Sequence, residues 1–345
     1  MGNHVLIKDP ELNGWEYGML RAFEAEIIKQ TNATTIDLPA NPVTQRVMKH
    51  FGQGMSRGKF RKYFPQQPLA LGGETVWYIL MGPENYRLDL FKNWQGKAKT
   101  KILYLFDTLP SQYPLIKRLF SNNDWDILIT SFNDAVQDLT AITGRKWYCL
   151  EQAADEQLFD PAPFNERLIH FSSYGRRYPA LHEAVKDFCT KNDLYYDFTT
   201  HDARHPVVDS PELYKQYAWH LNHSLFTFSW PVELTNPQRA GHLRPITCRW
   251  FEAAVAGTVI LGKAPGNDRF NTILDGELVL DLDPASTHSQ LVKTLDRIWE
   301  KREELFLKAQ SIRKKRVADW LWSTRVKSVL AMLETTEKEF NEYQV

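Results

Sequence analysis

The stretch "RPITCRWFEAAVAGTVILGKAPG", residues 244–266, predicts a short amphipathic helix, a glycine that ends it and then an apolar strand. A proline such as Pro245 is tolerated in the first turn of a helix, and Gly257 suits the left-handed conformation that follows a helix C-terminus. We expect one apolar stripe of this helix to pack on a sheet, because its members recur at helical spacing: Ile246, Trp250, Ala253 and Gly257.

Glu252 is a carboxylate in the middle of this apolar helix, and Arg249 lies three residues before it. Residues three apart are neighbours on a helix, so one interpretation is an exposed ion pair of little energetic weight. The other is a carboxylate that accepts hydrogen bonds from the ribose of a nucleotide, as acidic side chains do in nucleotide-binding doubly wound folds. The spacing by itself favours the first interpretation.

Short apolar runs alternate with helical patterns on both sides of this stretch. Before residue 152 we expect strands at 4–9, 76–82, 101–107, 126–131 and 146–151, and helices that include 15–30 and 112–120. After residue 166 we expect strands at 167–175, 194–199, 224–230, 258–262 and 277–283, and helices around 179–191, around 211–221 and from about 286 onward. This alternation predicts parallel sheets built from right-handed crossover units.

The segment 153–166, "AADEQLFDPAPFNE", has two prolines and no periodicity, and it separates the two series. The predicted fold class is therefore α/β, with two Rossmann-like doubly wound domains and an interdomain cleft. We place the domains at 1–152 and 153–310, and we expect the helices of 311–345 to pack back on the N-terminal domain. Ligands of such sheets bind at the carboxyl ends of the strands, which makes the cleft the expected site.

Composition restricts the class of protein. The chain has 345 residues, 43% hydrophobic and 24% charged, with a formal net charge of zero, which argues against a broad nucleic-acid-binding surface. Its three cysteines form no Cys-x-x-Cys pair, so zinc and redox motifs are unsupported. The N-terminus has no secretory apolar region and no stretch reaches the ~18 apolar residues of a membrane span, so we expect a cytoplasmic chain.

Three segments carry a resemblance to a known family. "RWFEAAVAGTVILG" (249–262) resembles the donor-binding helix and strand of glycosyltransferases with two Rossmann domains, the GT-B class, and is closest to their CgeB-like and family 4-like branches. "IHFSSYGRRYPALHEAV" (169–185) resembles the first strand and turn of their donor domain. "LEQAADEQLFDP" (150–161) resembles their interdomain segment.

The resemblance covers parts of residues 147–265 and none of the first 145. Two positions depart from the family pattern. Ala153 stands where the interdomain segment usually has a glycine, and Arg244 stands where family 4 enzymes often have a second glutamate near the donor sugar.

The resemblance implies a glycosyltransferase whose C-terminal domain, 153–310, binds a nucleotide-sugar donor, and whose N-terminal domain faces the acceptor. It implies that Glu252, beside Arg249, binds the ribose. It also implies that a turn after the first strand of the donor domain meets the diphosphate: Tyr174, Gly175, Arg176 and Arg177. A strand-to-helix turn with a glycine exposes N–H groups and the helix dipole to an anion, and arginines add bidentate donors. The alternative is a solvated basic turn.

Two further candidates lie in the N-terminal domain. Asp107 ends a predicted strand, where a polar side chain faces the expected cleft, and we interpret it as a catalytic base or acceptor contact. An N-cap for the following turn is the alternative. In "NGWEYG" (13–18), Gly14 and Gly18 leave room for a sugar or phosphate, and Gly14 and Trp15 are the acceptor-side candidates.

We expect no metal site and no cofactor, with the nucleotide-sugar acting as substrate. Asp281 and Asp283 form a D-x-D sequence, but alternate residues of a strand point to opposite faces, and arginines can neutralise a leaving diphosphate instead. The acceptor class stays open between saccharide, lipid-linked and small-molecule acceptors. The basic and aromatic segments 57–64 and 313–322 are suited to peripheral contact with anionic lipid or a polymeric acceptor, and the second also to packing between domains.

Two other functions fit the same architecture. Two Rossmann-like lobes also form hinge-closing receptors, so a non-catalytic protein that binds a sugar or nucleotide is one alternative. A sugar-nucleotide epimerase on the same scaffold is the other.

Overall fold

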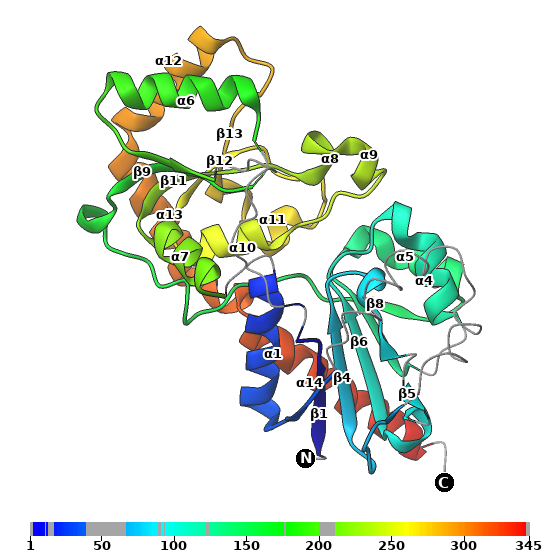
Figure 1. Cartoon of the computed structure of the whole chain (residues 1–345). Coiled ribbons are helices and arrows are strands. Elements are labelled where there is room, and N and C mark those ends of the chain that lie inside the picture. Colours follow the sequence, from blue (N-terminus) through cyan, green and yellow to red (C-terminus); the bar gives the residue numbers. More distant parts are fainter. Residues whose placement is uncertain are drawn as a thin grey trace. The chain divides into compact units, whose positions relative to one another are not determined.

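The structure is a computed structural model that describes residues 3–10, 12, 17–38, 67–88, 91–92, 94–121, 125–175, 177–199 and 211–342 (Figure 1). The chain divides into two compact units. The first contains Met1–Asn13 and Glu24–Leu150, and the second contains Gly14–Phe23 and Glu151–Val345. Each unit is built on a parallel sheet with helices, which confirms the predicted α/β class.

The sheet of the first unit has the strand order β2-β1-β4-β6-β7-β8 over the described residues, and every pair is parallel. Its strands are β1 (His4–Lys8), β2 (Thr34–Asp37), β4 (Thr75–Leu80), β6 (Thr100–Leu105), β7 (Ile127–Thr130) and β8 (Trp147–Cys149). Every residue of β4 is buried, as expected of a central strand covered on both faces. A separate parallel pair joins β3 (Gln67–Pro68) to β5 (Phe91–Lys92). Helices α4 (Tyr113–Phe120) and α5 (Val136–Thr143) belong to this unit, while α1 (Gly18–Thr31) is divided between the two units after Phe23.

The sheet of the second unit has the order β10-β9-β11-β12-β13 over the described residues and is also parallel. Its strands are β9 (Ile169–Ser173), β10 (Tyr196–Phe198), β11 (Ser224–Ser229), β12 (Val259–Gly262) and β13 (Val279–Asp281). Its helices are α6 (Pro179–Lys191), α7 (Pro211–Asn222), α8 (Val232–Thr235), α9 (Pro237–Ala240), α10 (Cys248–Val255), α11 (Phe270–Ile273), α12 (His288–Glu300), α13 (Arg302–Arg316) and α14 (Trp322–Glu342). Strand β9 lies between β10 and β11, so the strand order reverses there, and the carboxyl edge at such a reversal is where doubly wound folds generally bind ligands.

Short 3-10 turns connect several of these elements: Pro83–Asn85, Gln95–Lys97, Pro110–Gln112, Asn133–Ala135, Phe164–Glu166, Gly276–Leu278 and Val317–Trp320. None of the helices in the described part of the chain combines the length and the apolar content that crossing a bilayer requires.

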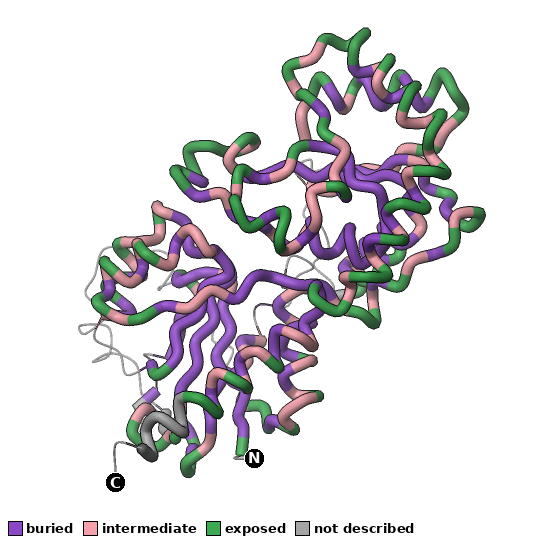
Figure 2. Tube along the Cα trace, turned by 180° about the vertical axis from the view of Figure 1, so that it is seen from behind, coloured by how far each residue is buried: buried purple, intermediate pink, exposed green. Residues whose placement is uncertain are grey.

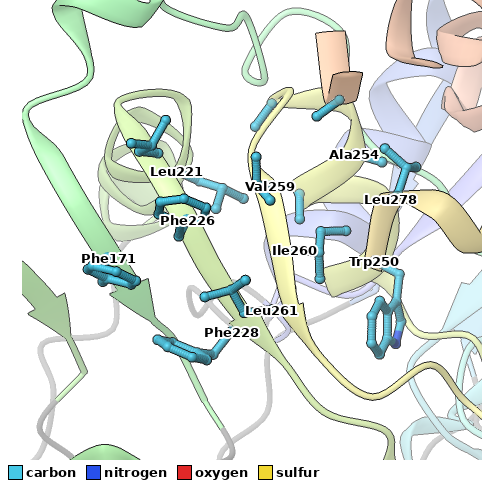
Figure 3. Close-up of a cluster of buried hydrophobic side chains, with 14 of the residues drawn as sticks. Phe171, Leu221, Phe226, Phe228, Trp250, Ala254, Val259, Ile260, Leu261 and Leu278 are labelled. Carbon is cyan, nitrogen blue, oxygen red and sulfur yellow. The ribbon is translucent and has the colours of Figure 1, made fainter. Parts of the chain in front are cut away.

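Apolar side chains fill the space between the second sheet and its helices. Figure 1 shows α6 and α12 side by side over one face of this sheet and α7, α10 and α13 on the other. The central strands form the buried centre of each unit, while most helices carry both buried and exposed residues (Figure 2). Phe171 of β9 stacks on Phe226 of β11 with ring centroids 5.1 Å apart, and Trp250 of α10 lies beside β12 (Figure 3). This core holds the carboxyl ends of the strands in place.

Helix α10 differs from the prediction in its start and in its burial. It begins at Cys248 rather than near Pro245, because the Gln152 side chain accepts the Cys248 N–H at 2.6 Å while Thr247 stays extended. Every residue of α10 except Arg249 is buried, so the helix is covered on all sides rather than along one stripe. The predicted glycine end is confirmed, since Gly257 has φ +60° and Thr258 N–H donates to Ala253 O at 3.1 Å.

Gly262 ends β12 at the carboxyl edge and requires a glycine for two reasons. Its φ of +148° is a conformation that L side chains rarely adopt. A Cβ placed there would lie 2.0 Å from the Ser229 carbonyl oxygen at the end of β11, which is paired with it in register. Close approach of these two strand ends therefore depends on the missing side chain.

We predict that Gly262→Ala destabilises the second unit by about 4 kcal/mol or more, because backbone strain adds to a clash with main-chain atoms. Gly175→Ala is the matched control: φ is +88° there, but a Cβ would meet no atom within 4 Å. Strain alone should cost the control about 1–2 kcal/mol. Denaturant unfolding followed by tryptophan fluorescence measures both, and equal losses for the two variants would contradict the close-approach argument.

Candidate functional site

The turn after β9 lies at the carboxyl edge of the second sheet. Ser173 ends the strand, Tyr174 follows it, and Gly175 takes φ +88°. The Gly175 N–H donates to Thr199 Oγ1 at 3.2 Å, just beyond the end of β10, so the neighbouring strand holds the turn in place. The Arg177 guanidinium lies 5.4 Å from the centre of the Phe198 ring. Arg176 lies outside the described residues.

Asp197 of β10 holds Tyr174 in position. The Tyr174 hydroxyl donates to Asp197 Oδ2 at 2.6 Å, and His220 Nδ1 of α7 contacts the same oxygen. Burial raises the pKa of Tyr174 well above its usual range, and the hydrogen bond to Asp197 raises it further. Tyr174 is therefore a neutral donor whose direction is set by a carboxylate.

Glu252 lies under the same edge in a buried cluster that we call the tyrosine–glutamate cluster: Tyr214, Tyr217, Arg249 and Glu252. The Tyr214 hydroxyl donates to Glu252 Oε1 at 2.7 Å, and the Tyr217 hydroxyl donates to Oε2 at 2.8 Å. The glutamate is only 1% exposed. The interpretation of Glu252 as a surface ion pair is therefore wrong, and its ribose role stays a prediction.

Arg249 is the member of this cluster that reaches solvent, with 26% of its side chain exposed. One guanidinium nitrogen lies 3.5 Å from Glu252 Oε2, and the guanidinium lies 4.3 Å from the centre of the Tyr217 ring. Burial lowers the pKa of Arg249, but Tyr217 and Glu252 outweigh it and hold that pKa above its ordinary value. The cation is thus held by a carboxylate and an aromatic face.

Tyr217 joins the two halves of the site. Its ring meets the Tyr174 ring edge to face, with centroids 5.1 Å apart, while its hydroxyl reaches Glu252. Tyr174, Arg249 and Glu252, predicted from separate motifs, therefore belong to one connected group. Tyr214 and Tyr217 were not predicted from the sequence, although their spacing of three on a predicted helix indicates that both share one face.

Gly18 corrects another prediction. We expected it to leave room for a sugar or phosphate, but a Cβ there would lie 2.1 Å from the Tyr214 ring, which fills that room. Gly18 and Tyr214 both belong to the second unit. The start of α1 therefore packs on a ring of the tyrosine–glutamate cluster. The acceptor-side candidates Gly14 and Trp15 lie outside the described residues.

Asp107 follows β6 at the carboxyl edge of the first sheet, where it is half-buried. Its N–H donates to Met81 O at 2.6 Å, which ties it to the end of the neighbouring strand β4. Its catalytic role stays a prediction. The same edge holds an ion pair that the sequence analysis missed, in which Arg87 Nη1 lies 2.9 Å from Asp9 Oδ1 and both side chains are buried.

Asp281 and Asp283 make contacts other than those of a metal site. Asp281 lies 3.6 Å from Lys263 Nζ, and Asp283 Oδ1 accepts the Ala285 N–H at 3.0 Å. The described ranges contain no group of three His, Cys, Asp or Glu side chains placed to hold a metal ion. Metal independence stays a prediction.

The basic segment 313–322 packs within the second unit. Arg313 Nε–H donates to Val255 O at 2.6 Å, and an Arg316 nitrogen donates to Thr272 O at 2.6 Å. Trp320 is fully buried and donates from Nε1 to Ile273 O at 2.8 Å. These three side chains pack within the unit, and a lipid or polymer contact of the segment stays a prediction. Segment 57–64 lies outside the described residues.

We predict that Tyr174→Phe and Asp197→Ala are coupled in a double-mutant cycle by about 1 kcal/mol of unfolding free energy, the range for a partly buried charge-assisted hydrogen bond. The exposed Glu183–Lys186 pair of α6, 3.1 Å apart, is the control, and its coupling should not exceed about 0.5 kcal/mol. Chemical denaturation of both cycles measures the two energies. Equal couplings would mean that Asp197 does not hold the tyrosine.

No protein-family model and no curated protein sequence matches this chain. Its fold, however, is similar to solved structures. A glycosyltransferase from Rickettsia africae ESF-5 aligns with a TM-score of 0.51 and 10% identity over 96% of this chain and 97% of the other. An alpha,alpha-trehalose-phosphate synthase (UDP-forming) from Burkholderia vietnamiensis aligns with a TM-score of 0.50 and 12% identity over 96% and 100%.

A trehalose-6-phosphate structure from E. coli bound with UDP-2-fluoro glucose aligns with a TM-score of 0.52 and 10% identity, over 96% of this chain and 98% of the other. At such identities the likeness describes the fold. The two parallel sheets and their helices thus form the two-domain α/β fold of GT-B glycosyltransferases.

Proposed function

We propose that this chain is a glycosyltransferase that moves a sugar from a nucleotide-sugar to a saccharide, lipid-linked or small-molecule acceptor and releases a nucleoside diphosphate. The observation that carries the proposal is the carboxyl edge of the second sheet. There the Tyr174–Gly175 turn and the Arg249–Glu252 pair, identified separately in sequence, meet through Tyr217. The likeness in fold to a structure bound with UDP-2-fluoro glucose supports a nucleotide-sugar as the donor class.

The proposed chemistry is stabilisation of a leaving diphosphate by fixed positive groups. Charge develops on the phosphate as the bond to the sugar breaks, and pre-placed donors stabilise it without reorganising. Arg176 and Arg177 supply cations in the sequence just before α6 (Pro179–Lys191), and the N-terminus of this helix favours an anion. Asp107 is the proposed base that accepts the proton of the acceptor hydroxyl. No metal is needed for this arrangement.

We predict that a nucleoside diphosphate raises the melting temperature in a screen of UDP, GDP, ADP and dTDP, with the monophosphate CMP beside them. Binding at 100 times Kd adds about 2.7 kcal/mol to the folded state. Replacing Arg176 and Arg177 with Ala should reduce the diphosphate affinity far more than the affinity for the matching nucleoside. Lys191→Ala, an exposed cation at the other end of α6, is the control and should change neither. Equal losses for diphosphate and nucleoside would mean that the arginines act structurally.

We also predict that turnover survives EDTA. The assay follows release of nucleoside diphosphate from the donor, with and without chelator, after extensive dialysis. Loss of activity that Mg²⁺ or Mn²⁺ restores would return Asp281 and Asp283 to the site as metal ligands. An isomerised donor formed without release of diphosphate would instead favour the epimerase, and binding without any turnover would favour the non-catalytic protein.

A further inference from the structure

We propose that Glu252 makes no contact with the donor and is a positioning residue, and that the group it positions, Arg249, binds the diphosphate. The inference rests on the proposed function, and it gives Arg249 and Glu252 different roles. It differs from the ribose role that the family resemblance implies for Glu252.

The carboxylate of Glu252 is already used within the protein. Each oxygen accepts a tyrosine hydroxyl, at 2.7 Å from Tyr214 and 2.8 Å from Tyr217, and the side chain is 1% exposed. Because the side chain has almost no exposed surface, a ribose diol could reach the carboxylate only if the two hydroxyls moved aside. The two tyrosines would then be left as buried donors without their acceptor, which is the costly outcome for a buried polar group. Direct contact with ribose therefore opposes the packing that surrounds Glu252.

Arg249, unlike Glu252, has part of its side chain exposed to solvent. It is the only residue of α10 (Cys248–Val255) that is not buried. Its position in the first turn of this helix adds the positive end of the helix dipole to its own charge. The planar guanidinium carries five N–H donors in a fork that matches phosphate oxygens. A cation held at this place suits a diphosphate better than it suits a neutral ribose.

The glycine turn lies one aromatic ring away from Arg249. The Tyr217 ring lies under the guanidinium at 4.3 Å and meets Tyr174 at 5.1 Å. Tyr174 in turn is fixed by Asp197, and Gly175 by Thr199. The turn after β9 and the first turn of α10 thus both adjoin the Tyr217 ring, which brings Arg249 close to the turn that we propose for the diphosphate.

The mechanism of positioning is electrostatic and steric. Glu252 Oε2 lies 3.5 Å from Arg249 Nη1 and balances its charge, and the Tyr217 ring packs against the guanidinium. Without the carboxylate charge, the long side chain of Arg249 gains freedom and its donors lose their fixed direction. Preorganised donors bind an anion more tightly than donors that must first be ordered.

The test measures by calorimetry the binding of three probes: the best-binding diphosphate among UDP, GDP, ADP and dTDP, its nucleoside, and inorganic pyrophosphate. Glu252→Gln keeps the shape of the side chain and removes its charge. We expect it to weaken diphosphate and pyrophosphate about tenfold and to leave the nucleoside within about twofold. Glu212→Gln, an exposed glutamate of α7 paired with Lys215, is the matched control and should change none of the three.

A double-mutant cycle separates positioning from independent binding. Arg249→Ala should weaken diphosphate at least as much as Glu252→Gln does, and the double variant should be no weaker than Arg249→Ala alone. Should Glu252→Gln fail to fold, Tyr217→Phe removes one donor from the carboxylate and keeps the ring under Arg249. It should weaken diphosphate and not the nucleoside.

Two results would overturn the inference and leave the proposed function intact. One is an equal loss of diphosphate and nucleoside with unchanged pyrophosphate in Glu252→Gln, which would place the carboxylate on the ribose. The other is additive losses in the cycle, which would make the two residues independent. If the unchanged chain bound none of the four nucleoside diphosphates, the proposed function itself would fail, and this inference with it.

Discussion

Glu252 carries a carboxylate at a position that is 1% exposed, and a charge removed from water must be compensated within the protein. Two tyrosine hydroxyls and a guanidinium provide that compensation. Because the tyrosines come from α7 and the arginine from α10, the carboxylate ties together two helices that cover the same face of the second sheet. Through Tyr217, which contacts Tyr174, this buried carboxylate also helps to hold the turn after β9 in place.

The parallel sheet supplies the second constraint. All of its strands end at one edge, so the residues that follow β9 and β10 meet there although they are more than 20 positions apart in sequence. Gly262 permits the close approach of β11 and β12, and Gly175 turns the chain after β9. Backbone conformations that favour glycine thus occur at the ends of strands.

The sequence predicted the strands of both sheets closely because buried parallel strands are continuous apolar runs. The residues of β4 and β11 are all buried, and both runs stand out in the sequence. Strand β2 (Thr34–Asp37) was not predicted, since most of its residues are exposed and polar and it lies at the edge of its sheet. The start of α10 was misplaced because Gln152, 96 residues away, caps it.

What the sequence by itself determined is the α/β class, the alternation of elements and the local motifs: the glycine turn at Tyr174–Gly175, the Arg249–Glu252 pair and the end of α10 at Gly257. Each depends on residues close in the chain, whose spacing is visible in the letters. Only the tertiary structure decided what these motifs touch. Glu252 was readable as an exposed pair or a ribose ligand, and its burial under Tyr214 and Tyr217 excludes the first. Hydrogen bonds between residues 35 and 38 positions apart leave no periodic trace in a sequence, because they form only when the helices pack on the sheet.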